Sequence, residues 1–130
     1  AAGPFAPVRD DPKIPAAAAA TVQRVVCCSG KVAYDLEDAR GDDPTTAIVR
    51  VELLYPWPAT AMLALRRRYP KARFVWCQEE PANMGAFAFV RDRFGWDGWS
   101  ARRAAASPAT GSLQKHKAEQ KELVAAALRG

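Results

Sequence analysis

The sequence has few of the residues from which metal sites are usually built. It contains a single histidine, His116, and three cysteines, Cys27, Cys28 and Cys77, which do not form separated Cys-x-x-Cys pairs. Zinc sites in proteins combine several histidines and cysteines at short, regular spacings. The sequence therefore predicts no metal site, and the three thiols are expected to be reduced and buried, as in a reducing compartment.

Glycine-rich phosphate motifs and nucleophile motifs are also missing. Ser29-Gly30-Lys31 follows a predicted strand and opens a predicted helix, but neither Gly-x-x-x-x-Gly-Lys nor Gly-x-Gly-x-x-Gly occurs. A turn that needs glycine explains this tripeptide, and a weak anion contact stays open as the alternative. Ser107 lies in a Ser-Pro turn without the Gly-x-Ser-x-Gly pattern of a hydrolase nucleophile. No catalytic residue is predicted.

Long apolar runs and clustered positive charge are absent as well. No run of about 18 apolar residues occurs, so no segment is expected to span a membrane, and the first residues lack the pattern of a signal peptide. The net charge is +5, from 19 Lys and Arg against 14 Asp and Glu, but the cations are scattered. The densest run, Arg66-Arg67-Arg68, ends a predicted helix, where positive charge is favourable. Nucleic-acid partners are therefore not expected.

What the sequence does contain is an alternation of two hydrophobic patterns. Residues 1–20, with four prolines followed by five alanines, are expected to be an extended lead-in. Residues 21–130 are expected to form the domain, with strands over 21–29, 46–51, 73–78 and 99–104 and helices over 31–40, 59–69, 81–95 and 114–128. Ser112 is a plausible N-cap of the last helix. This order predicts an α/β three-layer sandwich with a mainly parallel sheet and helices on both faces.

Two adjacent carboxylates, Glu79 and Glu80, end the third predicted strand. Neighbouring strand residues point to opposite faces of a sheet, so the pair is poorly placed for acid–base catalysis. Pro81 suits the first turn of a helix, and carboxylates just before it would interact favourably with the helix dipole. We expect the two carboxylates to stabilise a helix start and an interface, with Asn83 and Gly85 shaping the same turn; proton transfer is the alternative.

Several blocks occur in a fixed order and together resemble one family: VQRVVCCSGKVAYDL, AIVRVELLYPWP, RYPKARFVWCQEEPANMGAF and ASPATGS, followed by His116, Glu119 and Gln120. They are similar to the C-terminal domain of the decarboxylase component of the 2-oxoglutarate dehydrogenase complex. FAPVRDDP resembles the segment that leads into that domain. The resemblance covers nearly the whole chain, and it implies the fold of the transketolase C-terminal domain.

The resemblance implies a role beside chemistry carried out elsewhere. The parent enzyme uses thiamine diphosphate and Mg²⁺ to decarboxylate 2-oxoglutarate, and it passes the succinyl group to a lipoyl arm of the succinyltransferase component. The cofactor and magnesium motifs belong to upstream domains. Gly41-Asp42-Asp43 is similar to the start of such a magnesium motif, but no asparagine follows about thirty residues later, so it is interpreted as a loop. The expected partners are those upstream domains, the second subunit of a homodimer and the succinyltransferase component.

A further implication concerns regulation. In some members this domain helps to form a site for nucleotide or coenzyme A effectors, and Ser29, Lys31, Arg50 and His116 are the candidates here, although His116 alone would more ordinarily be a surface contact. A free-standing module that binds such effectors is the alternative function, and the equivalent domain of a pyruvate dehydrogenase or transketolase relative is a weaker one. The expected location is the mitochondrial matrix in a eukaryote and the cytoplasm in a bacterium.

Overall fold

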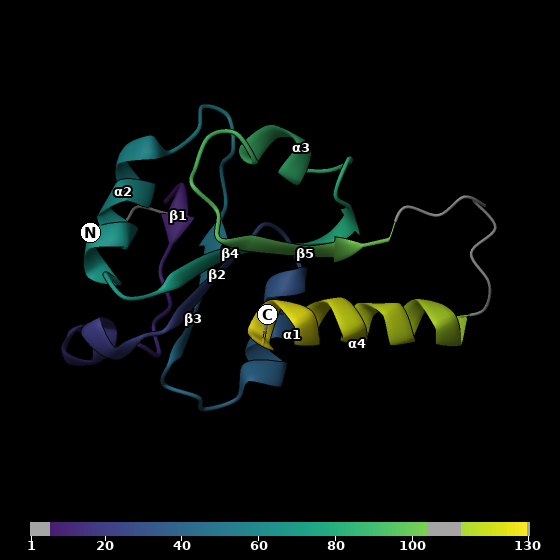
Figure 1. Ribbon diagram of the computed structural model, residues 1–130, viewed down its shortest axis with the longest axis horizontal. Coiled ribbons are helices and arrows are strands. Elements are labelled where there is room, and N and C mark those ends of the chain that lie inside the picture. The colour runs from purple at the N-terminus through teal and green to yellow at the C-terminus, as the bar shows by residue number, and fades with distance from the viewer. Residues whose placement is uncertain (1–5, 104–112, 130) are drawn as a thin grey trace.

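The structure, a computed structural model, describes residues 6–103 and 113–129. Strands and helices alternate along the chain, as the sequence predicts (Figure 1). The elements are β1 (Val8–Arg9), a 3-10 helix (Ala16–Thr21), β2 (Arg24–Cys28), α1 (Val32–Arg40), β3 (Thr46–Val51), α2 (Ala59–Arg68), β4 (Arg73–Pro81), α3 (Phe87–Val90), β5 (Gly98–Arg102) and α4 (Leu113–Arg129).

The five strands form one sheet in the order β1-β3-β2-β4-β5. Strands β2 to β5 run parallel, and only β1 is antiparallel to its neighbour. In the middle of the sheet, Val26 of β2 lies between Ile48 of β3 and Val75 of β4. All three are buried and β-branched, as expected for a parallel sheet that is covered on both faces.

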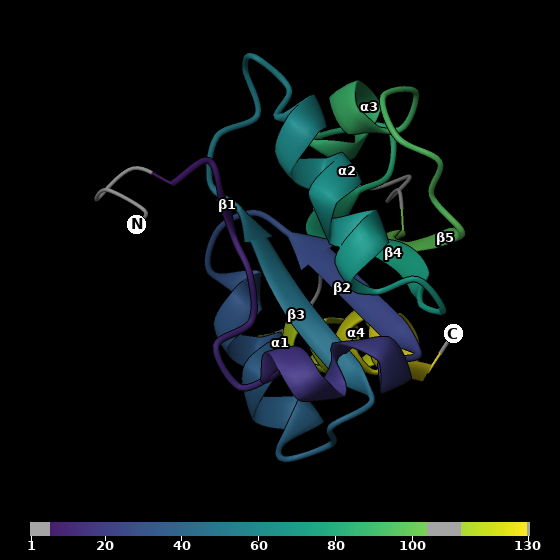
Figure 2. The same ribbon diagram turned by 90° about the vertical axis from the view of Figure 1, so that its left-hand side faces the viewer.

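Helices cover both faces of the sheet and complete three layers. Helices α1 and α4 pack on one face, whereas α2, α3 and the 3-10 helix pack on the other (Figures 1 and 2). The pleat of β2 divides its side chains between the two cores: Cys27 belongs to the α2 side and Cys28 to the α1 side. The predicted α/β sandwich is confirmed, and so is the prediction that these adjacent cysteines face opposite ways.

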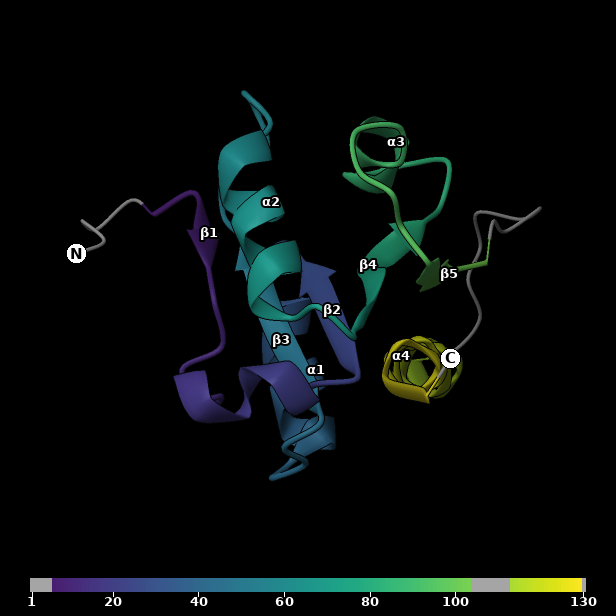
Figure 3. The same cartoon turned by 60° about the vertical axis from the view of Figure 1, so that its left-hand side comes forward.

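Each long helix packs against the sheet through an apolar stripe. Val32 and Leu36 lie one turn apart on α1, Met62 and Leu65 lie on α2, and Leu123, Val124 and Ala127 lie on α4. Figure 3 shows α4 end-on, lying beneath β5 at the side of the sheet away from β1. There the buried Ser100 hydroxyl of β5 donates a hydrogen bond to the Leu123 carbonyl at 2.6 Å.

The segment before β2 belongs to the same folded body. Val8 and Arg9 pair with Val51 and Arg50 of β3, and Ile14 and Ala19 are buried in the core on the α2 side. This packing was not predicted, because proline and alanine runs carry no hydrophobic period that would mark core positions. The expected sequence boundary between a lead-in and the domain stays a prediction.

Candidate functional site at the carboxyl end of the sheet

The sequence-predicted residues of the Glu79 turn lie at the carboxyl end of β4, but their local structure differs from the prediction. Glu79, Glu80 and Pro81 are the last residues of the strand, and Pro81 pairs with Arg102 of β5 across an irregularity in the ladder. Helix α3 begins only at Phe87 and has four residues. The predicted helix over 81–95, and with it the helix start that the two carboxylates would stabilise, is therefore wrong.

Gln78 explains why the chain does not become helical after Pro81. Its side chain is buried, and its carbonyl oxygen accepts hydrogen bonds from the Trp76 indole N–H at 3.0 Å and from the Phe87 backbone N–H at 2.7 Å. Its amide nitrogen donates to the carbonyls of Pro81 and Met84, each at 2.8 Å, and to that of Glu80. These carbonyls would otherwise need helical or solvent partners. The amide thus holds the whole turn in one conformation.

Gly85 allows this turn to close. Its φ is +62°, in the left-handed region that residues with a Cβ rarely adopt. A Cβ at this position would also lie 3.1 Å from the carboxyl carbon of Glu80. The prediction that Gly85 shapes the turn is consistent with this geometry, and Asn83 lies exposed at the tip of the same turn.

Glu79 takes part in a polar network that joins four elements, β4, β5, α4 and α1. Its carboxylate accepts a hydrogen bond from the Gln120 amide of α4 at 2.8 Å, and its backbone carbonyl accepts one from the Arg102 Nε of β5 at 3.1 Å. The Gln120 carbonyl oxygen in turn accepts from Arg102 at 2.6 Å, and its amide also donates to Asp35 of α1 at 3.0 Å. Glu79 therefore links β4 to β5 and α4, and Gln120 extends the network to α1.

Arg102 is the centre of this network. Its guanidinium also forms an ion pair with Glu119 at 3.1 Å and donates to the backbone carbonyl of His116 at 3.4 Å. Only 13% of the Arg102 side chain is exposed, so these bonds are partly shielded from water. The planar guanidinium can serve several acceptors at once, which a lysine ammonium cannot do with the same geometry.

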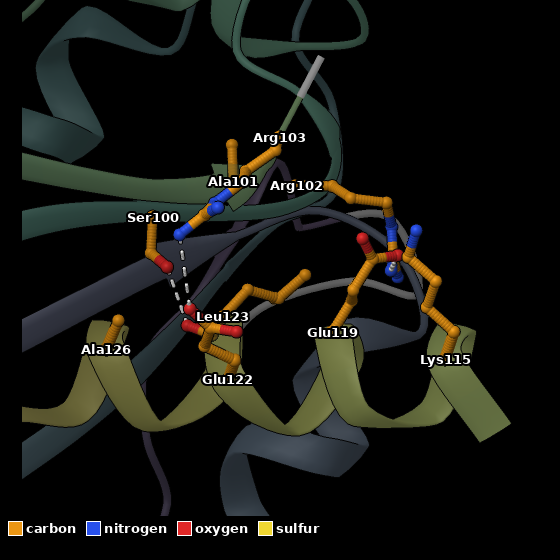
Figure 4. A pocket seen from close by; sticks show the side chains of 9 residues that line it. All are labelled: Ser100, Ala101, Arg102, Arg103, Lys115, Glu119, Glu122, Leu123 and Ala126. Atoms are coloured by element: carbon orange, nitrogen blue, oxygen red, sulfur yellow. Dashed lines mark hydrogen bonds and ion pairs between the residues drawn. The ribbon is translucent and has the colours of Figure 1, made fainter. Parts of the chain in front are cut away.

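A cavity of about 320 Å³ lies between β5 and α4, next to Arg102 (Figure 4). Glu119 and Lys115 lie on the same side of the view as Arg102, whereas Arg103 points toward Glu122. Four charged residues of its lining form two ion pairs: Arg102 with Glu119 at 3.1 Å, and Arg103 with Glu122 at 4.0 Å. The cavity holds neither a cysteine nor a histidine side chain among its lining residues. The cavity therefore lies at a packing interface, across which ion pairs join the β5 side to α4.

The predicted effector residues fall into two separate places. Ser29 and Lys31 follow β2, and Arg50 lies in β3 beside Cys28, so these three share the carboxyl end of neighbouring strands. His116 instead lies on α4, where its backbone carbonyl, rather than its imidazole, contacts Arg102.

Arg50 already has partners within the domain. It forms an ion pair with Glu37 at 2.6 Å, and its guanidinium carbon lies 4.7 Å from the centre of the Tyr34 ring. An anionic ligand at this place would have to compete with Glu37.

The cysteines are unsuited to nucleophilic chemistry. All three are free and buried. Burial raises the pKa of Cys28 and of Cys77 to about 12 and the pKa of Cys27 well above its ordinary value. A thiol attacks only as its thiolate, so none is activated near neutral pH. Among residues 6–103 and 113–129, no group of three or more His, Cys, Asp or Glu side chains could hold a metal ion.

The sequence as a whole matches a known family. The profile of the 2-oxoglutarate dehydrogenase C-terminal family matches residues 1–128. The chain belongs to this family. Membership confirms the resemblance drawn from its sequence blocks, and it does not favour a free-standing effector module. Nor does it favour a pyruvate dehydrogenase or transketolase domain.

Curated relatives of this 2-oxoglutarate dehydrogenase C-terminal domain carry the name 2-oxoglutarate dehydrogenase E1 component. The one from Cupriavidus necator is 44% identical over 119 residues, which cover 84% of this chain and 12% of the relative. Those from Rickettsia felis (39% over 121 residues) and Brucella anthropi (46% over 114 residues) cover 82% and 77% of the chain and 12% and 11% of the relatives. The chain thus spans about 12% of the length of these relatives.

Sequence reasoning missed the two residues that organise this end of the domain. Gln78 could have been found, because an amide at the end of the apolar run FVWC predicts a buried group in need of several hydrogen bonds. Arg102 carried no such signal, since its partners lie on β4 and α4. Ser107 and Ser112, to which the sequence assigned a turn and an N-cap, lie outside the described residues.

Proposed function

We propose that this chain is the terminal domain of a subunit that decarboxylates 2-oxoglutarate on thiamine diphosphate, and that it contributes packing rather than chemistry. In the parent, the succinyl group would pass to the lipoyl arm of the next component of the complex. The observation that supports this role is the network around Arg102. The polar groups at the carboxyl end of the sheet are directed toward one another and tie β4, β5, α1 and α4 together.

The described residues do not fit a site for the parent's cofactor. Magnesium is bound through carboxylate and carbonyl oxygens, and thiamine diphosphate is held through its bound Mg²⁺. Asp42 and Asp43 lie in the turn before β3, where Asp43 accepts hydrogen bonds from the backbone N–H and the hydroxyl of Thr45. We therefore assign no step of the reaction to these residues. The upstream domains of the parent would hold the cofactor.

The proposed partners follow from this assignment. They are the upstream domains of the same chain, the second subunit of a homodimer, and the lipoyl succinyltransferase component. Because the relatives named above are bacterial proteins, we infer that the parent works in a bacterial cytoplasm. Among the residues that the structure describes, no helix has the length and apolar character to traverse a membrane.

Activity measurements test the proposal directly. The chain by itself should release no CO₂ from 2-oxoglutarate when thiamine diphosphate and Mg²⁺ are supplied. A chimera of the Cupriavidus necator relative, in which this chain replaces the matching C-terminal segment, should be active, whereas the relative without that segment should not. Turnover by the isolated chain, or a folded chimera no more active than the truncated relative, would contradict the proposal.

A secondary proposal concerns an effector surface on the same domain. Ser29, Lys31 and Arg50 share one end of the sheet, but Arg50 is paired with Glu37. If an anionic effector binds here, Glu37→Gln should strengthen its binding because the competing carboxylate is removed. Calorimetric titration of the chain with AMP and acetyl-CoA tests this, and the absence of heat with both the original chain and the variant would exclude it.

A further inference from the structure

The apolar side chains exposed at the carboxyl end of the sheet point to a docking surface. Leu53 and Tyr55 lie in the loop after β3, and Met84 lies in the turn after β4; they are 49%, 63% and 57% exposed. The loop after β3 also contacts the helix that follows the β4 turn, because the Tyr55 ring lies 4.2 Å from the ring of Phe89 of α3, measured between centroids. We call Leu53, Tyr55 and Met84 the carboxyl-end apolar surface. Large apolar side chains gathered on one exposed surface commonly mark an interface.

The opposite end of the sheet has a different character. The turn that leads into β3 is Gly41-Asp42-Asp43-Pro44, and all four residues are exposed. The turn that leads into β4 contains the exposed Pro70 and Lys71. The loops at the two ends of the sheet have similar lengths. Exposed apolar side chains are therefore not a general feature of the loops of this domain.

The chain enters the domain next to the carboxyl-end apolar surface. Strand β1 is antiparallel to β3, so the chain enters the domain at the carboxyl end of the parallel strands (Figure 2). The Pro7 carbonyl accepts hydrogen bonds from the backbone N–H groups of Glu52, at 2.8 Å, and Leu53, at 3.2 Å. Pro7, close to the first described residue, therefore lies beside Leu53, at the edge of the carboxyl-end apolar surface.

We infer that the carboxyl-end apolar surface packs against the upstream part of the parent chain. This inference rests on the proposed function, in which the domain ends a much longer enzyme; the matched relatives are about eight times as long as the segment they share with this chain, since that segment is 12% of their length. The upstream segment is tethered at Pro7, so it is present at high effective concentration at this surface and needs little affinity of its own to remain bound. A second copy of this chain has no such tether.

Amide hydrogen exchange in the chimera described above tests the inference. Backbone amides in residues 52–58 and 82–86 should exchange more slowly by about tenfold or more in the chimera than in the isolated chain. The turn at residues 41–45, at the opposite end of β3, is the internal control and should exchange equally in both. Should the chimera not fold, the same comparison is made by adding the truncated relative to the isolated chain.

The melting temperatures of substituted proteins test the inference independently. Leu53→Ser combined with Met84→Ser should lower the melting temperature of the chimera and leave that of the isolated chain nearly unchanged, because both side chains are largely exposed in the isolated chain. Leu63→Ser is the matched control, since Leu63 is 53% exposed on α2 and lies outside both loops. It should affect neither protein.

The outcomes separate the inference from the proposed function. An active chimera with unprotected loops overturns the inference and leaves the proposed function intact. Protected loops in a chimera that releases no CO₂ support the docking surface and contradict the proposed function. Protection of the loops in the isolated chain that increases with protein concentration would assign the surface to a second copy of this chain and would overturn the inference.

Discussion

Gly85 and Gly41 both have a positive φ, but their surroundings differ. Their φ values are +62° and +61°, and Gly41 has a ψ of −128°, a conformation that residues with a Cβ rarely adopt. A Cβ on Gly41 would meet nothing within 4 Å, whereas one on Gly85 would lie 3.1 Å from the Glu80 carboxyl carbon and 3.2 Å from its Cβ. Of the two, only Gly85 therefore combines a positive φ with crowding by a neighbouring side chain.

Alanine substitution at Gly85 should therefore cost more than its backbone conformation alone. Gly85→Ala should lower the free energy of unfolding by about 1 kcal/mol for its positive φ and by about 1 kcal/mol more because the Glu80 side chain must move. The loss should be smaller in a Glu80→Ala background, where the carboxyl group that crowds the new Cβ is gone. Gly41→Ala should lower the free energy of unfolding by about 1–3 kcal/mol from backbone strain alone. Urea unfolding measures these values. Equal losses from Gly85→Ala with and without the Glu80 carboxyl group would show that Glu80 rotates away freely and that only the backbone matters at Gly85.

The buried thiols predict how stability depends on alkaline pH. The pKa values of Cys28 and Cys77 are raised by burial from 9.0 to about 12, so both thiols keep their protons in the folded state over a range where the unfolded chain loses them. Their contribution to stability is full below pH 9 and is lost as the pH rises from 9 toward 12. The free energy of unfolding should fall across this window by about 1.4 kcal/mol per pH unit for each thiol. Urea unfolding at pH 8 and pH 10.5 measures the fall.

A double variant isolates this effect. Cys28→Ala with Cys77→Ala should be less stable than the original chain at pH 8, because two buried side chains are shortened. It should nevertheless lose less stability between pH 8 and pH 10.5. An equal loss in both proteins would mean that other groups, such as Tyr69, whose pKa burial raises to about 12, control the alkaline response.

At the scale of elements, α4 is attached to the sheet by two different kinds of contact. Its carboxyl half is held by apolar residues, Leu123, Val124 and Ala127, which pack beneath the sheet. Its amino half has mainly polar and exposed residues and is held through Arg102, which contacts Glu119, Gln120 and the carbonyl of His116. The amino half should therefore detach first when the helix opens.

Conservative replacement of neighbouring arginines tests this view. Arg102→Lys should lower the free energy of unfolding by about 1–3 kcal/mol, because the ammonium cannot satisfy the acceptors that the guanidinium serves. Amide exchange over residues 113–120 should accelerate, while exchange over residues 123–129 changes less. Arg103→Lys is the control: its side chain is 90% exposed and its ion pair with Glu122 is 4.0 Å long. If the two variants behaved alike, Arg102 would not be the main attachment of the amino half of α4.

Elements with a clear hydrophobic period could be predicted from the sequence, and those defined by a distant partner could not. The strands at 46–51 and 73–78 and the helices at 31–40 and 59–69 match the structure closely. The strands are continuous apolar runs, and the helices have buried positions at helical spacing. The last residues of β4 extend to Pro81 because β5 pairs with them, and α3 is short because Gln78 and Gly85 form a turn instead. Neither cause can be read from local periodicity.

For the whole molecule, a buried ion pair fixes the segment before β2 to the rest of the domain. The Asp11 carboxylate accepts hydrogen bonds from the Arg40 guanidinium of α1 and, at 2.8 Å, from the backbone N–H of Ile48 of β3. The side chains of Asp11 and Arg40 are 1% and 2% exposed. The Asp11 carboxylate thus accepts a hydrogen bond from Ile48 of β3, beyond Arg50, where the pairing of β3 with β1 ends. Through this contact, the direction in which the chain enters the domain is coupled to the core.

Removing the charge of Asp11 should therefore loosen the entire entry segment. Asp11→Asn leaves the Arg40 guanidinium buried without a counter-charge, which costs about 3–5 kcal/mol in comparable sites. Urea unfolding should show this loss, and amide exchange should accelerate over residues 8–19. Asp42→Asn is the matched control, because Asp42 is fully exposed and its ion pair with Lys13 is 3.8 Å long; it should leave the free energy of unfolding nearly unchanged. If Asp11→Asn were as mild as the control, the entry segment would be held by Ile14 and Ala19 alone. The upstream chain would then be free to approach the carboxyl-end apolar surface from more than one direction.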